Sequence, residues 1–190
     1  MKSKKFILFW ILLISLFIYA FQRATNYEIT SYSASVTDLA TAATATDVFT
    51  ITGSATKTIR VTRIQISGIA TTAGAFDVAL IKRSTANTAG TSSAPTLVAH
   101  DSSSAAATAV VRAYTANPTL GTAVGTLQVR RIVLTTAAAG VAETPTVIEL
   151  GLRGEQPIFL RGVTEVLAVN LNGVTVTGGS FDIDVTFTEE

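Results

Sequence analysis

Residues 181–188 alternate strictly between apolar and polar side chains, and this pattern constrains the fold more than any other in the chain. Neighbouring side chains of a β-strand point to opposite faces, so the alternation places one set in a core and the other in solvent. One buried and one solvated face is typical of a strand in an antiparallel sheet. The apolar set is Phe181, Ile183, Val185 and Phe187, and the polar set is Asp182, Asp184, Thr186 and Thr188.

Residues 58–67 predict a second, longer strand, which we expect to be central to the sheet. The stretch is rich in β-branched residues and contains neither Gly nor Pro. Its alternation breaks near Arg63, and two explanations stay open: a β-bulge at that point, or apolar cover on both faces of the strand. The apolar residues on the two parities are Ile59 and Val61 on one, and Ile64 and Ile66 on the other.

Short apolar stretches separated by Gly, Pro, Asn and Thr turns fill most of the remaining chain. They predict eight to ten strands and an all-β domain over residues 47–190, an antiparallel β-sandwich that is jelly-roll-like. We expect hairpins at residues 53–56 and at Asn172-Gly173, and an exposed polar loop at residues 84–95. For residues 102–109 a short helix competes with a long loop. The other predicted strands are 48–52, 76–83, 96–101, 126–134, 146–150, 158–160, 165–171 and 174–176.

The N-terminus carries an apolar run of 16 residues, 6–21, preceded by three lysines. As a helix the run is about 24 Å long, slightly short for a membrane span but long for the core of a signal peptide. We favour an uncleaved anchor within residues 1–23, with removal after Ala20 or a buried core helix as alternatives. The preceding lysines predict a cytoplasmic N-terminus and a β domain on the extracytoplasmic side. Residues 24–46, rich in Ser, Thr and Ala, are interpreted as a linker.

Composition excludes two kinds of site. The chain has no cysteine, which removes disulfides and thiolate metal centres. Four basic residues lie within residues 1–23, and setting them aside leaves 10 basic and 13 acidic residues. A mildly acidic domain without basic clusters is a poor ligand for nucleic acid, because phosphate neutralisation supplies most of that affinity.

The candidates for chemistry are few. His100 is the only histidine, so a hydrolase triad would need it together with Asp101 and the serines at 102–104. The simpler interpretation, which we favour, is a strand that ends in a polar loop. Sequence adjacency does not create triad geometry, and the chain contains no nucleophile-elbow pattern.

Charged residues offer two further candidates. Asp182 and Asp184, with Glu189 and Glu190, supply oxygens of the kind that calcium prefers, or a pair of glycosidase carboxylates. We favour a solvated face whose acids also protect a sheet edge. Four arginines lie on the two strands that look most central, and we expect them to pair locally rather than across a subunit interface. They are Arg60, Arg63, Arg130 and Arg131.

Four segments of the domain carry a resemblance to a known group of proteins: 48–64, 80–87, 112–119 and 163–176. Over about residues 30–190 the domain resembles small β-rich structural proteins of tailed bacteriophages. The resemblance implies a virion component without enzymatic activity, such as a decoration or accessory protein, and transfers no functional residues. The apolar N-terminus departs from that pattern and leaves open a membrane-containing virion or a host envelope protein.

These observations lead to a hypothesis of a non-enzymatic structural or surface protein. We expect it at a virion surface or in a cell envelope, associating with copies of itself or with a particle shell, and with the membrane through residues 6–21. The alternative is a membrane-tethered or secreted module that binds a cell-surface ligand through loops at 84–95 and 102–119. A hydrolase is a third class, disfavoured by the single histidine. We expect no cofactor, no metal and no catalytic residue.

Overall fold

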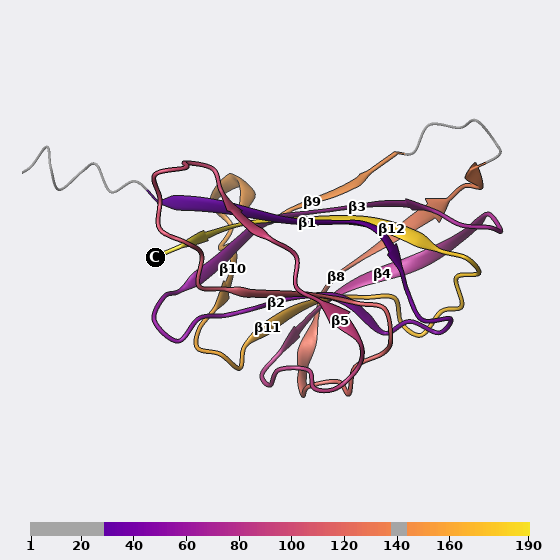
Figure 1. Cartoon of the computed structure of the whole chain (residues 1–190), viewed down its shortest axis with the longest axis horizontal. Coiled ribbons are helices and arrows are strands. Elements are labelled where there is room, and N and C mark those ends of the chain that lie inside the picture. The colour runs from indigo at the N-terminus through magenta and orange to yellow at the C-terminus, as the bar shows by residue number, and fades with distance from the viewer. Residues whose placement is uncertain (1–28, 138–143) are drawn as a thin grey trace, which may run out of the picture.

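A computed structural model describes residues 29–137 and 144–190, in which two antiparallel six-stranded sheets pack face to face (Figure 1). Sheet I has the strand order β10-β3-β12-β1-β6, and β9 lies beside β3. Sheet II has the order β5-β7-β2-β11-β4-β8. Apolar side chains from the inner faces of both sheets form one core. The predicted all-β antiparallel sandwich is therefore confirmed.

Twelve strands make up the two sheets in the described part of the chain. Sheet I contains β1 (Thr30–Ala40), β3 (Ile59–Ile69), β6 (Leu97–Ala99), β9 (Thr146–Glu149), β10 (Ile158–Leu160) and β12 (Ser180–Glu189). Sheet II contains β2 (Asp47–Thr52), β4 (Gly74–Arg83), β5 (Ser92–Ser93), β7 (Val110–Tyr114), β8 (Ala123–Leu134) and β11 (Val166–Asn170). Among these described residues no helix is long and apolar enough to cross a bilayer. The anchor predicted at residues 6–21 lies outside the described residues.

β3 and β12 correspond to the two stretches, 58–67 and 181–188, from which the sandwich was predicted. They pair with each other over almost their whole length. In β12 the apolar residues of the predicted alternation are fully buried, whereas the polar ones are half-buried on the outer face. β3 carries a bulge: Arg63 lies opposite Thr186, but Val61 lies opposite Phe187, so Thr62 is the extra residue. The bulge brings the apolar residues before and after it to the same core face, which is the first of the two explanations left open near Arg63.

β1 corrects the interpretation of residues 24–46 as a linker. Residues 30–40 form a strand of sheet I that pairs with β12 on one side and with β6 on the other. Tyr32, Ala34 and Leu39 of this strand face the core. Two of its inward positions are small or amphipathic, and Ser and Thr fill most of the rest, so its alternation is weak in the sequence.

The two predicted hairpins are also wrong, although their turns form. Residues 53–58 connect β2 in sheet II to β3 in sheet I, so these strands lie in different layers. Asn172 and Gly173 have φ values of 55° and 68°, as a tight turn requires, and Val174 donates to Leu171 O. Residues 174–176 then form no strand, and the chain crosses to β12 in the other sheet. Turn chemistry fixes the local bend but not the layer that the next strand joins.

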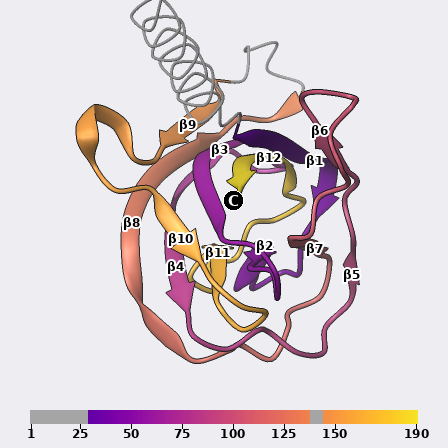
Figure 2. The same ribbon diagram turned by 90° about the vertical axis from the view of Figure 1, so that its left-hand side faces the viewer.

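A long two-stranded ribbon, residues 74–93 paired with 113–134, curves past β2 and β11 from one edge of sheet II to the other (Figure 2). It starts as the β4–β8 pair at one edge of sheet II. It continues through Ser84 N to Thr122 O (2.9 Å), paired Thr88 and Thr119, and Thr115 N to Thr91 O (2.9 Å). It ends as the β5–β7 pair at the opposite edge of the same sheet. Residues 84–95 are mostly exposed, as expected, but they belong to this ribbon.

The ribbon explains why β2 and β11 are buried on both faces. Their residues from Asp47 to Ile51 and from Val166 to Asn170 are all buried, although one face of each strand points away from the core. The near-continuous apolar run of β11 suits such a strand.

A buried carboxylate attaches the ribbon to sheet II. Asp47 Oδ2 accepts from Arg83 Nε (2.7 Å) and Asn87 Nδ2 (2.7 Å), and Oδ1 accepts from Arg83 Nη2 (2.8 Å) and Asn170 Nδ2 (2.6 Å). All four acceptor sites of the carboxylate are thus occupied. Arg83 Nη1 also donates to Gly121 O at 2.8 Å. No residue other than glycine fits at position 121, because a Cβ there would lie 1.9 Å from Thr85 O.

The tip of the ribbon, residues 94–112, closes one side of the sandwich. β6 adds to sheet I, and Tyr32 Oη donates to Ala105 O at 2.9 Å. Glu189 is 3% exposed, and its carboxylate accepts from Thr108 N (2.7 Å), Ala109 N (2.9 Å) and Thr108 Oγ1 (2.9 Å). Residues 102–109 are therefore a loop held by hydrogen bonds, and the competing short helix does not form.

Asp47→Ala is expected to lower the free energy of unfolding by about 3–5 kcal/mol, because it leaves the Arg83 guanidinium buried without its charge partner. Chemical denaturation monitored by circular dichroism measures the change. Asp77→Ala is the matched control, since it removes the acid of an exposed Asp–Arg pair. Equal effects of the two substitutions would contradict the role given to the buried network.

Glu189→Ala is expected to cost about 1–3 kcal/mol, because the buried N–H of Ala109 loses its acceptor. Hydrogen exchange should show faster exchange at Thr108 and Ala109. Glu190→Ala removes the neighbouring carboxylate, which pairs with Arg60 at a partly exposed site (2.6 Å), and should leave both amides protected. Unchanged exchange in Glu189→Ala would show that the tip is held by other contacts.

Candidate functional site

β8 is a free edge strand that exposes large apolar side chains. Among the described strands it is hydrogen-bonded to β4 on one side only. It exposes Val124 (64%), Leu127 (50%), Val129 (51%) and Val133 (69%), whereas Ile132 and Leu134 face the core. Apolar residues concentrated on one free edge are typical of a protein–protein contact surface.

Two β-bulges give β8 its shape. The register with β4 shifts between Leu80 and Ile81 and again between Lys82 and Arg83, which leaves Leu127 and Val124 as extra residues. Between Gln128 and Leu134 the strand is regular, with Val129 and Val133 on the outer face. Arg131 lies between these valines and pairs with Asp77 across the strand, Nε to Oδ1 at 2.9 Å. The regular half therefore offers an apolar outer face with one ion pair in it.

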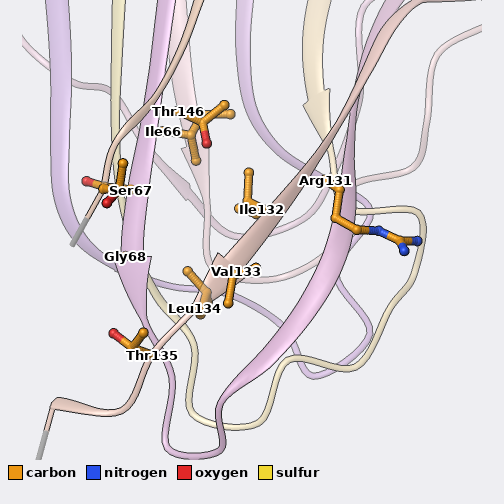
Figure 3. Close-up of a pocket in the computed structure, with 10 residues that line it drawn as sticks. Ile66, Ser67, Gly68, Arg131, Ile132, Val133, Leu134, Thr135 and Thr146 are labelled. Atoms are coloured by element: carbon orange, nitrogen blue, oxygen red, sulfur yellow. The ribbon is translucent and has the colours of Figure 1, made fainter. Parts of the chain in front are cut away.

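A groove of about 280 Å³ separates β8 from β3 and β9 of the other sheet. Its lining includes Ile66 and Gly68 of β3, residues 131–134 of β8, and Thr146 of β9. In Figure 3 Ile66 and Ile132 lie between the strands, while the Arg131 side chain points away from them. The two sheets are linked beyond the groove by Ala70 N, which donates to Thr135 O at 3.0 Å. This open side contrasts with the side that the ribbon tip closes.

His100 lies where the favoured interpretation placed it, at the end of β6 in an exposed position. Its Nε2 is 2.7 Å from Ser33 Oγ of β1, and not against the serines at 102–104. The Asp101 carboxylate turns toward Ser103 instead, accepting from its N–H (2.9 Å) and its hydroxyl (2.7 Å). The residue types of a triad are thus not assembled around His100 in the described structure.

The acids near the C-terminus are close in sequence but separate in space. Asp182 and Asp184 lie on the outer face of sheet I, where Asp182 Oδ1 accepts from Asp38 N at 2.9 Å. Glu189 faces the opposite way, toward the ribbon tip. The described residues contain no group of three or more His, Asp or Glu side chains that could hold a metal ion. β12 is an interior strand, so its acids do not protect a sheet edge, which corrects that expectation.

The four arginines pair locally, as favoured. Arg60 Nη2 lies 2.6 Å from Glu190 Oε1 and its guanidinium stacks on Phe159. Arg63 donates to Gln65, and Arg131 pairs with Asp77. Arg130 Nη2 lies 2.7 Å from the amide of Gln128, oriented so that its oxygen accepts. None of these contacts needs a second subunit.

The buried roles of the Asp47 and Glu189 carboxylates were not predicted from the sequence. A signal for Glu189 exists, because it shares the parity of Phe181 and Phe187 and so continues the core-facing set. No comparable signal marks Asp47, whose partners Arg83 and Asn170 are 36 and 123 residues away.

Two exposed carboxyls should titrate below their ordinary pKa of 3.8. The Ser103 N–H and then its hydroxyl lower the pKa of Asp101, and the hydrogen bond from Arg131 lowers the pKa of Asp77. A lowered folded-state pKa gives stabilisation that is present above pH 3.8 and is lost as the pH falls through the folded value. NMR titration of the carboxyl carbons should show Ser103→Ala raising the pKa of Asp101 alone and Arg131→Gln raising that of Asp77 alone. A shift of both carboxyls in either variant would contradict these local causes.

Comparisons with known proteins do not show which family this chain belongs to. Protein-family models, curated proteins and solved structures gave no match to this chain. The resemblance to bacteriophage virion proteins therefore stays a prediction.

Proposed function

We propose that this chain is a non-enzymatic structural or surface protein that assembles through the open side of its sandwich. The observation that carries the proposal is β8, a free edge strand with four exposed large apolar residues. Copies of the chain, or the subunits of a particle shell, are the partners that this surface suits. The wrapped ribbon supports a jelly-roll-like description of the sandwich.

Charge and bulges favour a face contact over strand addition. Bulges at Val124 and Leu127 interrupt the edge, and Arg130 and Arg131 would meet like charges in a self-paired β8. The valines at 129 and 133 stay available on the outer face. Burial of two such side chains contributes about 1.5–3 kcal/mol each, enough to matter when many copies repeat the contact.

The N-terminal sequence supports an extracytoplasmic location for the β domain. With residues 6–21 as an uncleaved anchor, the β domain lies on the extracytoplasmic side, at a cell envelope or the surface of a membrane-containing virion. Arginines paired with local acids and the acidic balance of the domain disfavour nucleic acid as a partner. The Asp101 carboxylate bonds to Ser103 while His100 bonds to Ser33, and this arrangement supports a role other than hydrolysis.

A binding module for a cell-surface ligand is the second candidate. The observation in its favour is that residues from the 84–95 and 102–119 segments meet at one pocket on the outer face of sheet II. This candidate needs no assembly, so the mass of the protein in solution separates the two.

Val129→Lys and Val133→Lys together are expected to convert an oligomer into a monomer, because they place charges in the proposed contact. Light scattering of the full chain in detergent, corrected for bound detergent, measures the mass. Both sites are exposed, so the free energy of unfolding should change by no more than about 0.5 kcal/mol. Val98→Lys, at a residue 57% exposed on the edge strand β6, is the matched control and should keep the oligomer. A monomeric unaltered chain would overturn the assembly proposal and favour the binding module.

A further inference from the structure

A second pocket, here called the outer pocket, lies on the outer face of sheet II, away from β8. β2 contributes Thr50, Thr52 and Gly53, and β7 contributes Val110, Arg112 and Tyr114. The ribbon adds Ala86 and Asn87, and Thr108 and Val163 complete the lining. The pairing of Thr50 with Arg112 and of Thr52 with Val110 places these outer side chains side by side.

The size of the outer pocket limits its ligand. Its volume is about 280 Å³. Pockets for drug-sized ligands hold about 300–1,000 Å³, so this one suits a single small unit rather than a chain. Asn87 is fixed by Asp47 and by Gly121 N, which it accepts from at 2.8 Å, so this part of the wall is rigid.

Two hydroxyl-bearing side chains line this site. Thr50 is 2% exposed and Tyr114 is 4% exposed, and both contribute to the lining of the outer pocket. A hydroxyl group can both donate and accept a hydrogen bond. A ligand with hydroxyl groups of its own would therefore find a partner at both positions.

Arg112 gives the outer pocket its charge. It is the only charged residue in the lining, and its one contact is a weak one, Nη1 to Ser92 Oγ at 3.4 Å. An exposed guanidinium without an acid beside it is suited to bind a carboxylate with two parallel hydrogen bonds. A single cation without a cluster of N–H donors suits a carboxylate better than a phosphate or sulfate.

The rim is apolar on two sides. Val110 is 45% exposed and Val163 is 58% exposed, and both line the pocket. Such walls suit the C–H face of a sugar ring, whose hydroxyls point sideways to the polar groups.

We propose that the outer pocket binds one carboxylated monosaccharide unit, of the uronic acid type. Arg112 holds the carboxylate, Thr50 and Tyr114 bind ring hydroxyls, and Val110 and Val163 pack against the ring. The site goes beyond the assembly function and does not depend on it, because β2, β11 and β4 lie between β7 and β8 in sheet II. A surface protein with this site would attach to acidic glycans.

Titration of the full chain with D-glucuronate and with D-glucose, followed by NMR or calorimetry, tests the proposal. An amine-oxide detergent avoids a sugar headgroup that would compete for the site. For a ligand of this size we expect a Kd on the order of 1 mM for glucuronate. Glucose, which lacks the carboxylate, should bind about tenfold more weakly.

Three variants separate the roles. Arg112→Gln should remove the preference for glucuronate while glucose binding stays unchanged, and Tyr114→Phe should weaken both sugars alike by about fivefold. Arg130→Gln, which removes another exposed guanidinium at the far edge of the sheet, should change neither. Thermal unfolding of each variant shows that it is folded. Equal binding of the two sugars, no binding of either, or a preference retained by Arg112→Gln would overturn the proposal.

Discussion

The buried carboxylate of Asp47 is the interaction on which the wrapped architecture depends. It takes hydrogen bonds from Arg83 and Asn87 of the ribbon and from Asn170 of β11, so one group joins three segments of the chain. A buried acid without such donors would cost several kcal/mol, and a buried arginine without its acid would cost as much. The ribbon therefore has one low-energy position across sheet II. That position in turn buries the outer faces of β2 and β11, which would otherwise be exposed apolar surface.

The sequence predicted the features that depend on local periodicity. The alternation of β12 and the broken parity of β3 are properties of single strands, and both strands form. Of the two explanations left open for β3, the structure shows the bulge, at Thr62. Local sequence does not decide which sheet the next strand joins. The chain therefore bends near residues 53–56 and turns at Asn172-Gly173, but neither segment closes the predicted hairpin. β1 was missed because inward residues such as Ala34 are small, so its core face has little contrast with its Ser-rich outer face. The outer pocket combines residues from β2, the ribbon and the ribbon tip. These residues are far apart in the sequence, so no sequence motif predicts that they form one pocket.

The two long sides of the sandwich differ in how they are closed. On one side the ribbon tip adds β6 to sheet I and is held by Tyr32 and Glu189, so the two sheets are joined there. On the other side β8 and β3 diverge and leave a groove, linked beyond it by the Ala70–Thr135 hydrogen bond. Free apolar edges usually invite aggregation, and β8 limits this with two bulges and two arginines. An edge that is exposed yet protected against strand pairing is suited to contact a specific partner.

One excursion of the chain, residues 74–134, contributes to both proposed surfaces. Its first and last strands, β4 and β8, form the edge assigned to assembly, whereas β7 and the residues around Asn87 form the outer pocket. Since β11 and β4 separate β8 from the pocket strands β2 and β7, a neighbour packed on β8 would leave the pocket open. Assembly would then multiply a weak site, because linked copies bind a repeating glycan far more tightly than one copy does. A pocket that is small and of millimolar affinity is therefore consistent with attachment, provided that many copies present it together.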